Sequence, residues 1–160
     1  MSSFEISERP VACAPPIGAL YDYWRSVHPA GALPGRQHID PMAIPSLLPH
    51  LWMLDVQRYP LRFRFRLIGT MIVKFTGRDS TGLWYDEVYP DFAASDGFPG
   101  LTACALDGRP QYRSGPVSSI PDRGHVTAER LYLPLAKDGQ LVDVLLNMTF
   151  YREQYNTPPR

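Results

Sequence analysis

The sequence predicts an α+β domain: a five-stranded antiparallel sheet with its helices on one face, preceded by an amphipathic N-terminal helix. Three observations predict this class. Leu61 to Leu67 alternates strictly between apolar residues and arginines, which is the period of a half-buried strand. Residues 70–107 carry short helical segments that glycine and proline interrupt. Three strand patterns then follow in succession, as in a meander.

The N-terminal helix begins at Pro15-Pro16, since proline is tolerated in the first helical turn. Apolar side chains recur at helical spacing until Pro29 and Gly31 end the pattern. Such a stripe must cover an apolar surface, either the chain's own sheet or a second subunit. We expect a homodimer whose contact uses four side chains of the stripe: Ile17, Leu20, Tyr21 and Trp24.

The other elements follow from periodicity and turn residues. Gly69 permits a reversal, Thr70 is expected to cap a helix over 71–76, and Gly77 to end it in the left-handed conformation. Asp138-Gly139 indicates a hairpin. The predicted strands are 51–56, 61–67, 111–117, 126–135 and 141–151, and a broken helix is predicted over 91–107, with short helices near 42–48. We divide the chain into 1–32 (tail and amphipathic helix), 33–152 (domain) and 153–160 (disordered tail).

Composition excludes several classes of function. Lysine plus arginine equals aspartate plus glutamate at 16 each, so no net charge attracts nucleic acid or an anionic membrane. No apolar run approaches the roughly 20 residues of a membrane helix, and no secretory signal opens the sequence. Cys13 and Cys104 belong to no CxxC pair, which favours idle thiols in a reducing compartment. We therefore expect a cytoplasmic protein.

Catalytic and metal motifs are absent from the sequence. The four histidines lack metal-ligand spacing, and no GxSxG nucleophile elbow occurs. The loop 77–82 begins like a phosphate-binding loop but lacks the following Lys-Ser/Thr, which favours a capped turn. An enzyme on a cone-like α+β fold stays open as an alternative, with Asp55, Tyr112 or Asp143 acting in the cleft.

The arginine face of the strand 61–67 leaves a second alternative. Three guanidinium groups at alternate positions, those of Arg62, Arg64 and Arg66, can grip phosphates of a nucleotide or another polyanion. Single-stranded nucleic-acid platforms need aromatic residues on the same face, however, and here they lie on the opposite one. This favours a solvated face with local acidic partners.

The chain resembles a PAS domain, and more specifically the stand-alone PAS-like proteins of alphaproteobacteria. The likeness runs from Leu33 to Tyr151 and rests on five motifs: PGRQHIDP, LLPHLWMLDV, FRFRLIGT, GRDSTG and LPLAKDGQLVDVLL. The resemblance implies a non-catalytic sensory or protein-interaction module that signals through a partner protein. It also implies that a small apolar ligand would lie between the sheet and the helices of 70–107.

The resemblance implies a set of pocket residues and disfavours two cofactors. Haem-binding relatives use a helical histidine in the region equivalent to 91–107, and flavin-binding relatives a cysteine in an Asn-Cys-Arg-Phe-Leu-Gln type motif; this sequence has neither. No metal is expected, and the ligand stays unnamed. The expected pocket residues are Phe65, Leu67, Met71, Phe75, Trp84, Leu101, Cys104, Leu133, Val144 and Leu146.

Overall fold

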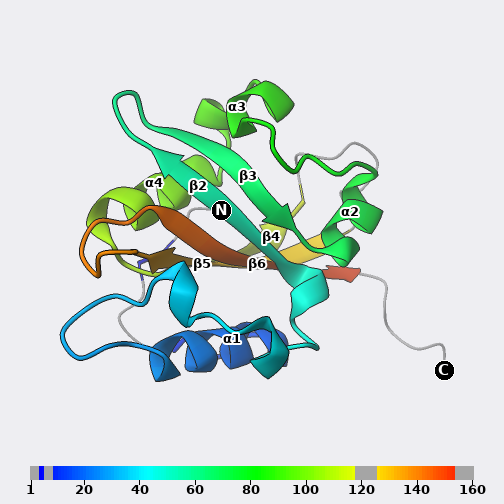
Figure 1. Cartoon of the computed structure of the whole chain (residues 1–160). Helices are drawn as coiled ribbons and strands as arrows, with labels where there is room; N and C mark the ends of the chain where they lie inside the picture. The colour runs from blue at the N-terminus through cyan, green and yellow to red at the C-terminus, as the bar shows by residue number, and fades with distance from the viewer. Residues whose placement is uncertain (1–3, 6–8, 118–125, 154–160) are drawn as a thin grey trace, which may run out of the picture.

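The computed structural model describes residues 4–5, 9–117 and 126–153. Within these ranges one antiparallel sheet runs in the order β1-β4-β5-β6-β2-β3 (Figure 1). The five predicted strands are present, and a two-residue strand is added at one edge. The strands are β1 (Phe4–Glu5), β2 (Leu51–Gln57), β3 (Arg62–Ile68), β4 (Gln111–Pro116), β5 (Val126–Leu135) and β6 (Val144–Glu153).

The topology places the last strand, β6, beside β2, the first long strand of the chain. β2 and β3 form a hairpin, helices then cross the sheet, and β4, β5 and β6 form a meander that returns to β2. β6 begins later than the predicted residue 141, because Asp138 holds the preceding turn. Its carboxylate accepts hydrogen bonds from the backbone N–H of Gln140 at 2.9 Å and of Leu141 at 2.8 Å.

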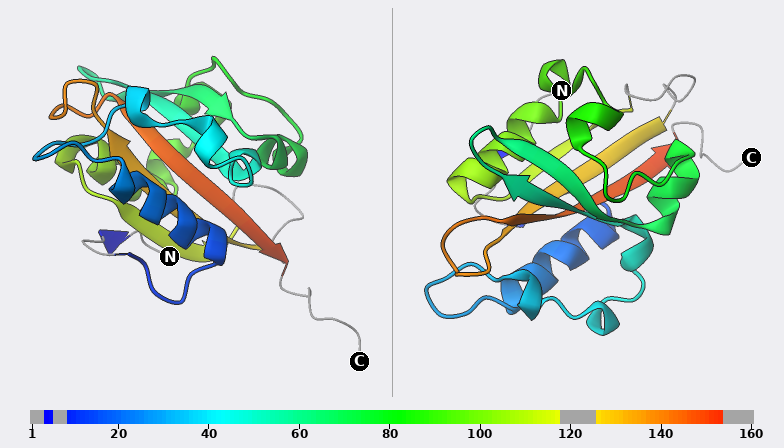
Figure 2. Two further views of the ribbon diagram at one scale, coloured as in Figure 1. Left: turned by 60° about the horizontal axis from the view of Figure 1, so that its bottom comes forward. Right: turned by 45° about the horizontal axis from the view of Figure 1, so that its top comes forward.

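Helices cover both faces of the sheet. α1 (Pro15–Ser26) lies on one face, while α2 (Thr70–Thr76), α3 (Tyr85–Val88) and α4 (Phe98–Asp107) lie on the other (Figures 1 and 2). The helices of 70–107 therefore share one face, as predicted. Short 3₁₀ turns complete the chain: η1 (Arg36–His38), η2 (Pro41–Ala43), η3 (Leu48–His50) and η4 (Phe92–Ala94).

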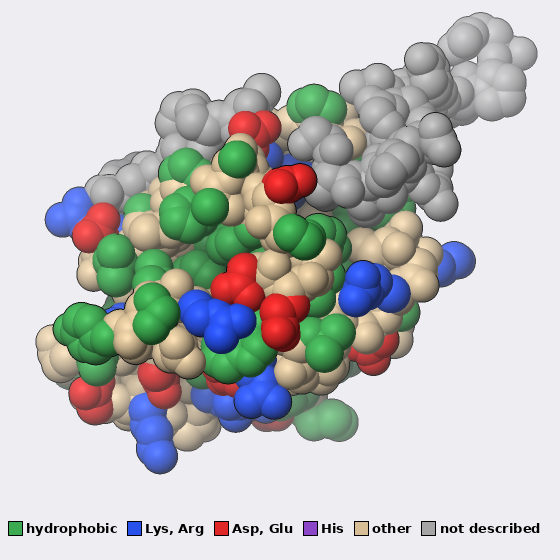
Figure 3. All heavy atoms as spheres, turned by 90° about the horizontal axis from the view of Figure 1, so that it is seen from above, with side chains coloured by type: hydrophobic (Ala, Val, Ile, Leu, Met, Phe, Trp, Pro, Cys, Tyr) green, Lys and Arg blue, Asp and Glu red, His purple; other side chains and the backbone are tan. Residues whose placement is uncertain are grey.

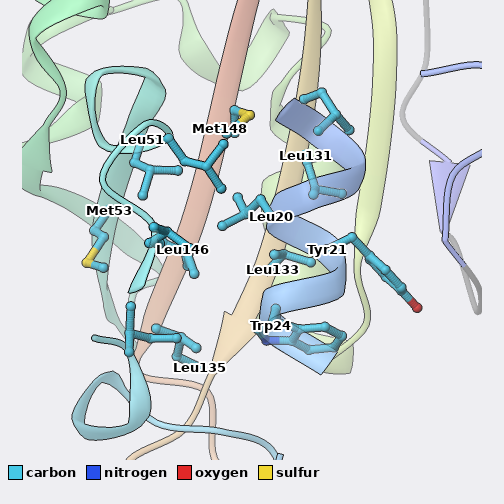
Figure 4. Packing of buried hydrophobic residues seen from close by; sticks show 14 of the residues in the cluster. Leu20, Tyr21, Trp24, Leu51, Met53, Leu131, Leu133, Leu135, Leu146 and Met148 are labelled. Carbon is cyan, nitrogen blue, oxygen red and sulfur yellow. The ribbon is translucent and has the colours of Figure 1, made fainter. Parts of the chain in front are cut away.

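The apolar stripe of α1 packs against the chain's own sheet (Figure 4). The indole N–H of Trp24 also donates to the carbonyl of Pro134 at 3.0 Å. The dimer contact expected from the stripe is thus corrected, because a side chain buried inside one chain presents nothing to a second. The four side chains concerned, Ile17, Leu20, Tyr21 and Trp24, are all buried.

The start of α1 is fixed by a buried acid on β5. The Glu129 carboxylate accepts hydrogen bonds from the backbone N–H of Ala14 and from the Tyr112 hydroxyl, both at 2.8 Å. It also forms an ion pair with Arg152. Ala14 is the N-cap residue and has no capping side chain of its own. A carboxylate at this position satisfies an unpaired N–H and favours the positive end of the helix dipole.

Gly69 joins β3 to α2 through a close backbone approach. Its φ of −67° is ordinary, but a Cβ at this position would lie 2.3 Å from the carbonyl oxygen of Pro49. Its N–H donates to the carbonyl of Leu51 at 2.6 Å. Gly69 is the N-cap of α2, so the expectation that Thr70 caps this helix is wrong. Gly77 ends the helix with φ +82°, as the sequence predicts.

Candidate functional site

A cavity of about 480 Å³ lies between the sheet and the helical segments α2, α3 and η4. This volume falls in the range of roughly 300–1,000 Å³ that small-molecule sites occupy. Five strands supply its floor, and the helical segments supply its walls. The sheet residues that line it are Trp52, Phe65, Ile68, Arg113, Arg130, Tyr132, Thr149 and Tyr151.

Two arginines occupy neighbouring positions on the cavity floor. Arg113 of β4 and Arg130 of β5 are directly paired in the antiparallel register. Thr149 of β6 is the next residue in this cross-strand row. Like charges directly opposite each other destabilise a sheet. Sheet stability therefore does not explain this pair.

Neither guanidinium has a compensating partner among the residues that the structure describes. Arg113 is 6% exposed, and its Nε is buried without a hydrogen bond. Nη1 of Arg130 is likewise buried without one. Burial lowers the pKa of Arg130, and the nearby charge of Arg113 lowers it further. A buried cation without a partner is costly, so the fold alone does not account for these two side chains.

Two carboxylates also lie along the cavity, those of Asp91 and Asp96. Asp96 takes part in an interaction of its own, and no ion pair joins Asp91 to Arg113 or Arg130 within the described part of the chain. Arg78 lines the cavity too and is exposed. The cavity lining therefore contains three cationic and two acidic side chains, and two of the cationic side chains have a buried nitrogen without a hydrogen bond to the described residues.

Aromatic rings from the sheet and from the helical segments form an apolar part of the cavity lining. Phe65 and Tyr85 stack with centroids 4.9 Å apart, and Tyr85 lies 4.1 Å from Phe92. Trp52 continues the cluster, and its indole N–H donates to Thr149 at 2.9 Å. Burial raises the pKa of Tyr85 far above its usual range, so this phenol stays neutral. A planar apolar molecule fits such a wall.

The structure separates the expected pocket residues into several environments. Phe65 lines the cavity. Leu101 and Cys104 are fully buried in the apolar cluster beside it, where burial raises the pKa of the Cys104 thiol well above its usual value. Leu67 and Met71 are each 41% exposed, away from the cavity lining.

Five further pocket expectations fall on other surfaces. Phe75 stacks on Tyr151 at 3.9 Å, and Trp84 lies under the Arg62 guanidinium at 4.1 Å; neither Phe75 nor Trp84 lines the cavity. The remaining three are wrong because they face α1 on the opposite side of the sheet. These are Leu133, Val144 and Leu146.

Sequence reasoning missed the polar floor because it assigned the most apolar strand face to the pocket. Since α1 covers one side of the sheet, that apolar face packs against α1 instead. The mixed face lines the cavity. The available signal was the recurrence of polar residues with a period of two inside otherwise buried strands, at Arg113, Arg130, Tyr132 and Thr149.

The arginine face of β3 is occupied by local partners, as its pattern favours. Arg62 makes two hydrogen bonds of 2.8 Å to Asp86, and Arg66 pairs with Asp55 at 3.0 Å. Arg64 donates to the carbonyl of Gly82 at 2.9 Å. On the face that Figure 3 shows, basic and acidic side chains are interspersed. The polyanion alternative therefore loses its free guanidinium groups.

The three residues considered for catalysis do not meet in the cavity. Asp55 is held by Arg66, and the Tyr112 hydroxyl donates to Glu129 on the α1 side. Asp143 accepts a hydrogen bond from the backbone N–H of Lys137 at 3.0 Å. None of the three lines the cavity.

The described residues contain neither a metal-binding cluster nor a membrane-spanning helix. No group of three or more His, Cys, Asp or Glu side chains there could hold a metal ion. In that same part of the chain, no helix has the length and apolar character needed to cross a membrane. Cys13 and Cys104 are both free thiols.

The antiparallel sheet and its helical crossover form a fold of the PAS type. The PAS domain family model matches residues 13–148, so this chain belongs to the PAS domain family. The structure is similar to one described as an RNA-binding light-oxygen-voltage receptor, with a TM-score of 0.51 and 12% identity.

That alignment covers 92% of this chain and 37% of the receptor chain, and at this identity it shows the fold alone. No curated protein matches the sequence. Family and fold together support a sensory or interaction module in general.

Proposed function

We propose that this PAS domain is a sensory module that binds a small molecule in the cavity between the sheet and α2, α3 and η4. The cavity itself carries the proposal, because it combines a volume of about 480 Å³ with aromatic walls and a few convergent polar groups. A partner protein would read its occupancy, since the described residues hold no catalytic constellation in the cavity.

The sequence predicts an apolar pocket, whereas the floor of the proposed binding cavity is the mixed polar and apolar face of the sheet. Domain limits of 33–152 and a cytoplasmic location belong to the same proposal. A homodimer would need a surface other than the buried stripe of α1. The mass of the native protein in solution determines whether one exists.

Native mass spectrometry with an absorption spectrum of the purified chain tests the proposal. We expect either a co-purified small molecule or a rise in melting temperature with one of three probes: 2-naphthoate, 2-naphthalenemethanol or 2-naphthylmethylamine. The substitution Ala94→Trp should abolish the effect, because Ala94 lines the cavity. Ala93→Trp, on the same 3₁₀ turn but outside the lining, should not.

A protein that carries no molecule and whose melting temperature none of the probes changes would refute the proposed function. An effect that survives Ala94→Trp unchanged would place binding elsewhere and would refute it equally.

A further inference from the structure

Resting on the proposed function of the cavity, we infer that its ligand is a small organic carboxylate with a planar apolar body. The carboxylate would bind Arg113, Arg130 and Tyr132 on the floor, and the body would lie against the aromatic wall. The sequence predicts a small apolar ligand, and the carboxylate adds a charged group to that ligand.

The two guanidinium groups favour an anionic ligand. They face each other in register on adjacent strands, and each has a buried nitrogen without a hydrogen bond to the described residues. Arg62 and Arg66, by contrast, each have a carboxylate partner at the surface. Arginine matches the planar fork of a carboxylate, and a shared anion removes the repulsion of the pair.

Tyr132 supplies a third donor beside the arginines. Its hydroxyl makes no hydrogen bond to the described residues and lies near Gly97: a Cβ on Gly97 would be 3.5 Å from the hydroxyl oxygen and 3.6 Å from Nη2 of Arg113. The missing side chain of Gly97 therefore leaves open the space between a phenol and a guanidinium. That space is where an oxygen of the ligand can accept from both.

The N-terminus of α4 reinforces the preference for an anion. Gly97 is the N-cap of this ten-residue helix, lines the cavity and provides no capping side chain. The dipole of the helix favours negative charge at this end, although Pro99 has no N–H and the N–H of Phe98 already donates to the carbonyl of Ser95 at 3.3 Å. Arg113 favours an anionic ligand independently of the helix, because the residue is only 6% exposed and its Nε has no hydrogen bond to the described residues.

The aromatic wall sets the body of the ligand. Phe65 of β3 stacks on Tyr85 of α3, and Tyr85 contacts Phe92 of η4 in a tilted arrangement. Trp52 contacts both Phe65 and Tyr85 at centroid distances of 6.2 Å. A planar ring gains dispersion and quadrupole contacts there, whereas a bare inorganic anion would leave this surface uncovered.

Isothermal titration calorimetry with three probes tests the inference: 2-naphthoate, its neutral analogue 2-naphthamide, and inorganic phosphate. We expect naphthoate to bind most tightly. Losing a charged hydrogen bond should weaken binding by about tenfold or more, both for naphthamide and for naphthoate binding to Arg113→Met or Arg130→Met. Arg66→Met makes the same chemical change at the surface and should leave the affinity unchanged. Circular dichroism confirms that each variant is folded.

Equal affinity for naphthoate and naphthamide, with no effect of either cavity substitution, would overturn the carboxylate site while leaving a small-molecule cavity in place. Phosphate binding as tightly as naphthoate would overturn the planar body. If a lysine at position 113 (Arg113→Lys) restores full affinity, charge alone would explain binding, and the paired arginine geometry would be wrong. Binding of neither naphthyl probe would overturn the inference, and the wider probe set above would then test the cavity independently.

Discussion

At the scale of single residues, Arg113 and Arg130 each keep a buried nitrogen without a hydrogen bond to the described residues. Arg113 has lost most of its hydration, faces Arg130 across the strand pair and makes no ion pair within the described residues. Arg58 shows what a structural arginine looks like in the same chain. Its guanidinium donates to the carbonyls of Val142 at 2.6 Å and Ala105 at 3.0 Å. Arg58 thus supports the fold through hydrogen bonds, whereas the proposed role of Arg113 is to bind a ligand.

Arg113→Met should therefore stabilise the protein in the absence of ligand. Replacing an uncompensated buried charge by an apolar side chain of similar length should raise the free energy of unfolding by about 1 kcal/mol. Arg58→Met is the matched control and should lower it by about 1–3 kcal/mol, because two backbone carbonyls lose their donor. Urea denaturation measures both values. If the two variants are destabilised alike, Arg113 is paired in solution and the argument from its isolation fails.

At the scale of elements, α1 is part of the core and not an appendage. Its stripe packs on β5, β6 and β2, and the N–H of its N-cap residue Ala14 donates to Glu129 of β5. Because isolated helices of this length are marginal in water, tertiary packing supplies most of its stability. Changes to the stripe should consequently act on folding.

Leu20→Asp should unfold the chain or lower its stability by well over about 3 kcal/mol, since Leu20 is fully buried and Leu→Ala at such sites already costs about 3–5 kcal/mol. Ala19→Asp, one residue earlier on the exposed side of α1, should cost about 0.5 kcal/mol from helix propensity. Urea denaturation combined with the mass in solution separates the outcomes. A folded Leu20→Asp variant with half the native mass would show that the stripe joins two subunits after all.

The sequence predicts elements better than faces. The Leu61–Leu67 alternation, the Gly77 C-cap and the strand 126–135 appear in the structure close to where their patterns place them. Periodicity distinguishes the two faces of a strand but does not show which helix covers each face. Leu133 and Leu146 therefore face α1 and not the cavity, contrary to the sequence-based expectation.

Other features depend on contacts between distant residues that no local pattern encodes. The capping of α1 by Glu129 joins positions 115 residues apart. The four-residue helix α3 is too short to produce a periodic signal. The pairing of Arg113 with Arg130 follows from strand register, which is fixed by the whole sheet.

At the scale of the whole molecule, we expect the sheet to have a higher free energy of local opening than the helical segments that form the cavity wall. α1, β5 and β6 share one extensive apolar cluster. The wall consists of a seven-residue helix, a four-residue helix and a three-residue 3₁₀ turn. Such short segments depend on neighbouring contacts, so they belong to the part of a protein that opens at the lowest free energy. Ligand contacts would therefore change the wall before the sheet.

Hydrogen exchange of the full chain, with and without 2-naphthoate, measures this coupling. In the free protein the amides of 85–97 should exchange faster than those of β5, and bound ligand should slow exchange in 85–97 severalfold. Exchange in α1 should not change, because the sheet separates it from the cavity. The Ala94→Trp variant, with a large side chain in the cavity lining, should show no response to the probe. Protection that appears in α1 instead, or equally across the chain, would mean that the wall does not report occupancy. A partner would then have to contact another surface. Selective protection of 85–97 would instead identify these residues as the surface that changes when a ligand binds.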